Sequence, residues 1–128
     1  MFHIFSSQEE RREYGGSAFI EMQFCKLPHK TSVSGIVAIE SIKNWKNDSL
    51  YIDDENEFYL EYSQIFDCGV YNNLKSGIVD VYGINYYAPA QVAPIISKIL
   101  ACRPKEYAVL VEWLEKAMQY NGFYILGI

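Results

Sequence analysis

The sequence predicts an α+β fold, with a mostly antiparallel sheet, two adjacent C-terminal helices and a buried C-terminal strand. Three observations lead to this prediction. Apolar and polar residues alternate over short segments in the first two thirds of the chain, as in half-buried strands. The spacing then changes to a helical one, and the last six residues are almost wholly apolar. Strands and helices that occur in separate runs are typical of α+β proteins.

The length and composition predict one α+β domain over residues 1–128. A chain of 128 residues suits one domain and is too short for two ordinary ones. Half of the residues are apolar or aromatic, which supports a sizeable core and argues against intrinsic disorder. We find no internal repeat, no low-complexity tract and no linker-like run in the sequence.

Targeting signals and cysteines point to the cytoplasm. No apolar run approaches the roughly 20 residues needed to cross a bilayer, and residues 1–12 lack the basic opening and apolar stretch of a secretory signal. Cys25, Cys68 and Cys102 are odd in number and far apart, unlike the cysteines of a disulfide framework. We therefore expect a cytoplasmic protein whose cysteines pack as small apolar residues.

Three internal strands are predicted, in addition to a first strand around His3. Residues 17–25 alternate after Gly15-Gly16, with one face formed by Ala18, Ile20, Met22 and Phe24. Residues 57–62 alternate in the same way and are also predicted to be a strand. Residues 77–87 have two apolar faces, so we expect a longer strand in the middle of the sheet. The segment 31–45 fits a helix or a strand, and helix is favoured.

The last third of the chain predicts two helices and a strand. The first helix begins at Pro89 and runs to about Ala101, with a kink or delayed start at Pro94. The second begins at Pro104, with Glu106 in its first turn and an apolar stripe of Tyr107, Leu110, Val111, Leu114 and Met118. Asn121-Gly122 ends that helix. Residues 123–128 then form a strand that we expect to be buried, because an exposed apolar edge promotes aggregation.

No motif for catalysis or for metal binding is recognisable in the sequence. Cys68 and His29 carry no local signature of a nucleophile and its base, and His29 lies in a predicted surface turn. The run from Asp53 to Glu57 lacks the glycine and the ordered spacing of a calcium loop. No glycine-rich phosphate-binding fingerprint is present. We therefore expect a binding protein rather than an enzyme, without a cofactor or a metal.

The negative charge is concentrated in residues 48–67. This segment has seven acids and no base, whereas the rest of the chain has nine acids and eleven bases, which gives −7 and +2 for the total of −5. Nucleic acids and anionic membranes bind cationic surfaces, so neither is an expected partner of this segment. A solvated acidic loop is one interpretation, and a docking site for a basic protein is the other.

Tyrosine accompanies these acids, and this favours the docking interpretation. On a strand over residues 57–62, Glu57, Tyr59 and Glu61 lie on one face. An aromatic ring between two carboxylates is a suitable anchor for Lys or Arg, since it supplies buried area and cation–π attraction. The predicted partner-binding residues are Asp53, Asp54, Glu55, Glu57, Tyr59 and Glu61.

Three C-terminal segments carry a resemblance to a known group of proteins. They are the run Tyr82–Pro89, the helix that contains Trp113, and the end Gly122–Ile128. Together they resemble the bacterial immunity proteins of contact-dependent growth inhibition and related polymorphic toxin systems. The resemblance implies a protein that binds the toxic C-terminal domain of a delivered effector and blocks its active site or an essential surface. Many such toxins are basic nucleases, which an acidic segment would complement. The group shares no interface motif, so no binding residue is carried over.

Two other functions stay open at this point. One is a small-molecule-binding or enzymatic domain with a tyrosine-lined pocket, built from Tyr82, Tyr86 and Tyr87. The other is a structural subunit or homo-oligomer whose aromatic surface is used in self-association. The oligomeric state is not specified by any of these patterns.

Overall fold

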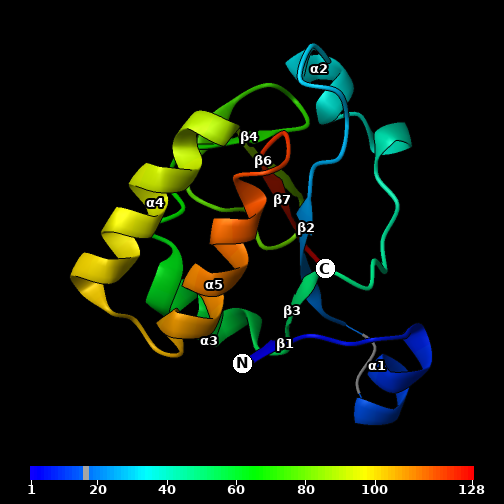
Figure 1. Ribbon diagram of the computed structural model, residues 1–128, viewed down its shortest axis with the longest axis vertical. Coiled ribbons are helices and arrows are strands. Elements are labelled where there is room, and N and C mark those ends of the chain that lie inside the picture. Colours follow the sequence, from blue (N-terminus) through cyan, green and yellow to red (C-terminus); the bar gives the residue numbers. More distant parts are fainter. Residues whose placement is uncertain (16–17) are drawn as a thin grey trace.

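A computed structural model describes residues 1–15 and 18–128 and confirms the α+β class (Figure 1). The strands of the described chain form one antiparallel sheet in the order β1-β3-β2-β7-β6-β4-β5. Their bounds are β1 Phe2–His3, β2 Ile20–Phe24, β3 Leu50–Ile52, β4 Gly69–Tyr71, β5 Ser76–Gly77, β6 Ile84–Tyr87 and β7 Phe123–Leu126. The helices are α1 Gln8–Tyr14, α2 Val33–Ile36, the 3-10 turn η1 Ile39–Ser41, α3 Glu55–Tyr62, α4 Pro89–Cys102 and α5 Tyr107–Ala117.

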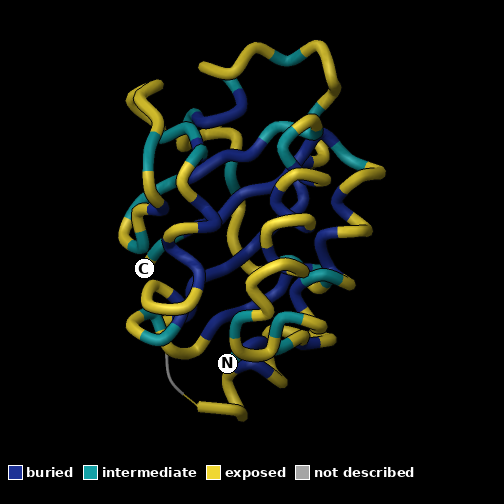
Figure 2. Tube along the Cα trace, turned by 90° about the vertical axis from the view of Figure 1, so that its left-hand side faces the viewer, coloured by how far each residue is buried: buried dark blue, intermediate teal, exposed yellow. Residues whose placement is uncertain are grey.

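The C-terminal strand β7 is central and buried, as the sequence predicts. It pairs with β2 on one side, where Met22 lies opposite Ile125, and with β6 on the other, where Tyr86 lies opposite Tyr124. All four of its residues are buried. The strand therefore joins the group β1-β3-β2 to the group β6-β4-β5. Figure 2 shows this buried centre surrounded by exposed outer turns.

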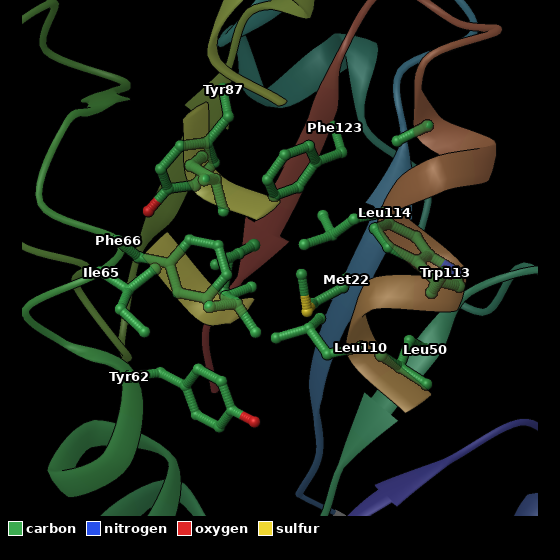
Figure 3. Close-up of a cluster of buried hydrophobic side chains, with 14 of the residues drawn as sticks. Met22, Leu50, Tyr62, Ile65, Phe66, Tyr87, Leu110, Trp113, Leu114 and Phe123 are labelled. Carbon is green, nitrogen blue, oxygen red and sulfur yellow. The ribbon is translucent and has the colours of Figure 1, made fainter. Parts of the chain in front are cut away.

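The two faces of the sheet bury two different clusters. Helices α4 and α5 lie side by side over one face (Figure 1), where Phe123 and Ile125 of β7 enter the main core. Figure 3 shows part of this core, including Met22, Leu50, Tyr62, Phe66, Leu110, Trp113, Leu114 and Phe123. The opposite face carries Tyr124 and Leu126, which pack with residues of α2. Strand alternation therefore assigns successive residues of β7 to opposite layers.

The prediction of a strand over residues 57–62 is wrong, because these residues belong to helix α3. Asp54 caps the helix, since its carboxylate accepts a hydrogen bond from the Glu57 amide at 3.0 Å. The fully buried Phe58 and Tyr62 are four residues apart and lie on one helical face. Over so short a segment, an apolar residue at every second position fits a strand as well as a helix. The Asp54 cap favours the helix.

The predicted strand over residues 77–87 is shorter than expected, because only β6 and the end of β5 are strands. Between them the backbone turns, and the buried amide of Asn85 replaces the missing strand partners. Asn85 accepts a hydrogen bond from the Asp80 amide at 2.8 Å and donates to the carbonyls of Asp80 and Ile125 at 2.8 and 2.9 Å. These bonds satisfy backbone groups that a ladder would otherwise pair.

Strand β2 begins at Ile20, later than predicted, and Ser17 lies outside the described residues. Ala18 is exposed, whereas both faces of β2 are buried rather than one. Within the segment 31–45 the helical elements are the short α2 and η1. The helix predicted there is therefore reduced to a few residues.

The C-terminal helices agree with the prediction in order and differ in their bounds. Helix α4 begins at Pro89 and continues through Pro94 without a delayed start. Helix α5 begins at Tyr107 rather than Pro104, because Glu106 adopts a positive φ of 58° just before it. The buried stripe of α5 also differs from the prediction, with Met118 exposed and these residues inside: Leu110, Trp113, Leu114 and Ala117.

Candidate functional site

The predicted binding residues gather around α3, but they do not share one face. In a helix of 3.6 residues per turn, Glu57 and Glu61 lie on one side and Tyr59 is turned away from both. The expectation of a common Glu57-Tyr59-Glu61 face is therefore wrong. Glu57 and Glu61 point to the connection between α4 and α5, where they contact the ammonium and the backbone amide of Lys105.

Basic groups of the same chain neutralise a large part of the acidic segment. Four of its carboxylates have such a partner: Asp48 with Lys26 (2.6 Å), Asp53 with the Met1 amino group (3.9 Å), Glu57 with Lys105, and Asp67 with Lys98 (3.4 Å). Among the described residues the other three, Asp54, Glu55 and Glu61, form no ion pair. All three belong to α3 or its cap. The negative surface is thus smaller than the sequence predicts, and α3 carries it.

The side of α3 opposite Lys105 lines a groove of about 490 Å³, which we call the α3 groove. Its walls are α3 and the turn before β6, and its lining residues are Glu55, Asn56, Tyr59, Leu60, Val81 and Tyr82. Leu60 is 81% exposed, Tyr82 68% and Tyr59 43%. Large apolar side chains that are this exposed and adjacent are uncommon on a protein with no partner, because they leave apolar area in water.

The sequence positions both walls of the α3 groove firmly. Phe58 and Tyr62 fix α3 on the core, and the Tyr62 hydroxyl donates to the Lys105 carbonyl at 2.6 Å. The opposite wall is held by the segment after β7, where the Ile128 amide donates to the Val81 carbonyl at 3.0 Å. A Cβ on Gly127 would lie 2.5 Å from Val81 backbone atoms, so glycine permits this close approach.

Sequence reasoning placed two residues of the α3 groove in the binding site, named Tyr82 only for the alternative tyrosine-lined pocket, and missed the others. Glu55 and Tyr59 are among the predicted binding residues, whereas Leu60, Val81 and Tyr82 are not. The helical spacing of Asn56, Tyr59 and Leu60 is the signal that would have joined these residues on one face. The approach of Val81 and Tyr82 depends on tertiary structure and has no local signal.

Asp53 lies outside the α3 groove and has a structural role. It accepts hydrogen bonds from His3 Nε2 at 2.7 Å and from the Tyr14 hydroxyl at 2.9 Å, and thereby ties β1 and α1 to the end of β3. Partial burial raises the pKa of Asp53, but these hydrogen bonds and the nearby Met1 amino group outweigh burial, so its pKa is lowered overall.

Asp53→Asn is expected to lower the free energy of unfolding by about 1 kcal/mol at pH 7. Because the folded-state pKa of Asp53 is lowered, its contribution is present above the unfolded pKa and is lost as pH falls through the folded value. The deficit should therefore shrink as pH falls below about 4, the ordinary pKa of Asp, and vanish once the folded-state carboxyl is protonated. Urea denaturation over a series of pH values from 7 downward measures it. Asp67→Asn is the control, since its pair with Lys98 is exposed and should contribute little. A deficit that persists at low pH would contradict the prediction.

The proposed tyrosine-lined pocket is not formed by the predicted residues. Tyr86 is buried in the cluster against α2, Tyr87 is buried in the main core, and Tyr82 is exposed at the α3 groove. Within residues 1–15 and 18–128, no three His, Cys, Asp or Glu side chains gather as metal ligands would. None of the helices in this part of the chain has the length and apolar character to span a bilayer.

Comparison with known proteins adds no relative, since no family model, curated protein or solved structure matches the chain. The fold and the site themselves describe an α+β domain with an exposed aromatic and apolar groove on its most acidic helix.

Proposed function

We propose that this chain is an immunity protein that binds and neutralises a cognate bacterial toxin domain with a basic surface, and that the α3 groove is its docking site. The observation that carries the proposal is the exposure of Tyr59, Leu60 and Tyr82 beside one another. Aromatic side chains in a concave site are the usual anchors of protein interfaces. The resemblance of the C-terminal segments to immunity proteins suggests that the partner is a toxin domain.

Charge supports a basic partner. Glu55 lines the α3 groove and has no ion-pair partner among the described residues, and Asp54 lies one residue before it. Lys or Arg of a partner that enters beside Tyr59 would meet both a carboxylate and an aromatic face. Unpaired carboxylates on one helix also increase the rate of encounter with a basic protein. The apolar wall then provides the area that keeps the complex together.

The division of α3 into two sides explains how one helix serves both folding and binding. One side holds the chain together through Glu57, Glu61 and Lys105. The other side leaves Leu60 and Tyr59 largely exposed to solvent. A bound toxin domain would cover the second side and leave the first intact, so the free and bound proteins share one fold.

Leu60→Arg is expected to weaken binding to the toxin domain encoded beside this gene by 100-fold or more, about 3 kcal/mol. The substitution removes the most exposed apolar side chain of the α3 groove and adds a charge of the same sign as the partner. Calorimetry with the purified domain measures the change. Growth of cells that produce the toxin domain together with either variant gives the corresponding functional result.

Leu100→Arg is the matched control, since Leu100 is an exposed leucine, 49% accessible, on α4. It should bind the toxin domain and protect cells like the unmodified protein. Equal binding by both variants would remove the α3 groove as the docking site. Failure of the unmodified chain to bind any domain encoded beside it would remove the immunity function itself.

A further inference from the structure

Arg11 is a buried cation with an incomplete set of partners. This residue of α1 is only 7% exposed, and its Nε and Nη1 atoms have no hydrogen-bond acceptor among the described residues. Burying a guanidinium without an acceptor is unfavourable by several kcal/mol, because the protein does not replace the lost water. A buried donor of this kind that lines a cavity is available to an acceptor from outside the chain.

Aromatic rings hold the guanidinium in place without neutralising it. Its central carbon lies 3.6 Å from the ring centroid of Trp45 and 5.5 Å from that of Phe19. Cation–π contacts stabilise the charge through the ring faces. The N–H groups lie in the plane of the guanidinium, so they remain available to an acceptor that approaches from the edge.

A single acid is buried among the described residues, and it has other partners. Glu21 is 4% exposed and accepts hydrogen bonds from four donors: the Trp45 amide (2.8 Å), the Lys46 amide (3.2 Å), the Ser49 hydroxyl (2.6 Å) and the Gln23 amide group (3.1 Å). Within the described chain it forms no ion pair with Arg11. The carboxylate of Glu21 is therefore satisfied, whereas the guanidinium is not.

A small cavity lies against Arg11, and none of the described residues that line it is an acid. Its volume is about 30 Å³, and its lining residues are Phe5, Ser7, Gln8, Arg11, Trp45, Lys46, Asn47 and Tyr51. Arg11 and Lys46 are cations, and the side chains of Gln8 and Asn47 add amide donors. The volume exceeds the roughly 10–15 Å³ that a cavity needs to hold one water molecule. It suits a single small anionic group and excludes a nucleotide or a sugar.

The backbone at the edge of this cavity is strained. Trp45 has a φ of 71°, a left-handed conformation that is unfavourable for an aromatic residue. In this conformation the Trp45 ring lies over Arg11. The Trp45 backbone amide donates a hydrogen bond to the Glu21 carboxylate at 2.8 Å. Strain of this kind persists where the surroundings fix it, and it is frequent in ligand-binding sites.

We propose that the Arg11 cavity binds a carboxylate group, which completes the hydrogen bonds of the buried guanidinium. Carboxylate is the planar anion that matches the donors of arginine. The same chemistry occurs in a free small carboxylate and in a carboxylate carried by a protein. This site is separate from the α3 groove, and its test requires no toxin domain.

The test replaces sodium chloride by sodium formate at constant ionic strength and follows Tm. The unmodified protein is expected to gain about 4 °C when formate is at roughly ten times its Kd. Arg11→Met should show no gain. No response of the unmodified protein, or an equal response of Arg11→Met, would overturn the proposal.

Asn47→Asp places a carboxylate at the cavity and keeps the test decisive if Arg11→Met does not fold. It should have a higher Tm than the unmodified protein in formate-free buffer and should no longer respond to formate. Asn44→Asp, outside this cavity, is the matched control and should still respond. An Asn47→Asp protein that responds to formate like the unmodified one would contradict the proposal.

The source of the carboxylate is distinguished with two further probes. Acetyl-aspartate N-methylamide carries its carboxylate on a peptide backbone, whereas acetate differs from formate by one methyl group. Tighter binding of the aspartate compound than of formate supports a carboxylate carried by a protein. Tighter binding of formate or acetate supports a free small carboxylate. Binding of none of the three overturns the site.

Discussion

Gly122→Ala is expected to destabilise the fold by about 3–5 kcal/mol, the sum of backbone strain and steric overlap. Gly122 has a φ of 77°, and a Cβ at this position would lie 2.0 Å from the carbonyl oxygen of Tyr87. That oxygen belongs to the backbone at the end of β6, so the overlap is relieved only if a central strand moves. The Gly122 carbonyl also accepts a hydrogen bond from the Cys25 amide at 3.0 Å.

Urea denaturation of Gly122→Ala and of Gly15→Ala separates the two contributions. Gly15 has a φ of 103°, but among the described residues a Cβ there meets no atom within 4 Å beyond its chain neighbours. Its substitution should therefore cost only the strain, about 1–2 kcal/mol. A total stability of about 5–15 kcal/mol is usual for a domain, so Gly122→Ala should lose much of it. Equal losses in the two variants would show that the overlap contributes nothing.

Trp113→Ala is expected to cost about 3–5 kcal/mol, the range for removing a large buried aromatic side chain. Its ring stacks on Phe24 with centroids 4.2 Å apart and meets Phe123 edge-on at 5.9 Å. Its indole nitrogen donates to the Asp48 carbonyl at 2.9 Å, so the substitution also leaves that carbonyl without this donor. The ring connects α5 with β2 and β7, which explains the size of the effect.

Trp113→Phe is the control, since it keeps most of the packing and removes the hydrogen bond. We expect a loss of about 1–2 kcal/mol from the missing donor and the smaller ring. Urea denaturation followed by far-ultraviolet circular dichroism measures both variants without relying on tryptophan fluorescence. If the phenylalanine variant is as unstable as the alanine variant, the hydrogen bond to Asp48 rather than the packing accounts for the loss.

The elements that sequence reasoning predicted well are those with strong and long signals. Helix α4 begins at its proline, and β7 is an apolar segment that only a central position buries. Helix α3 was misassigned because Phe58, Leu60 and Tyr62 alternate as in a strand over a segment too short to separate the two periods. The turn before β6 was missed for another reason. The side chain of Asn85 satisfies its backbone groups, and this interaction has no signal in the local pattern.

The candidate site was predictable only in part. The acidic composition pointed to α3 and to two residues of the α3 groove, Glu55 and Tyr59. The pairing of Glu57 with Lys105 joins segments far apart in the sequence, so composition overestimated the free negative charge. Nothing in the local sequence indicates that Arg11 is buried, because a basic residue in a charged helix is expected to face solvent.

The position of β7 determines when the sheet can form during synthesis. Residues 20–24 emerge from the ribosome long before residues 123–126, yet these two strands are neighbours. Among the described residues, the group that contains β2 and the group that contains β6 are joined in the sheet only through this later strand. Each group therefore has an unpaired strand edge until β7 has been synthesised. Unpaired edges of this kind associate readily with other chains. We expect the complete sheet to form only after residue 126 has left the ribosome.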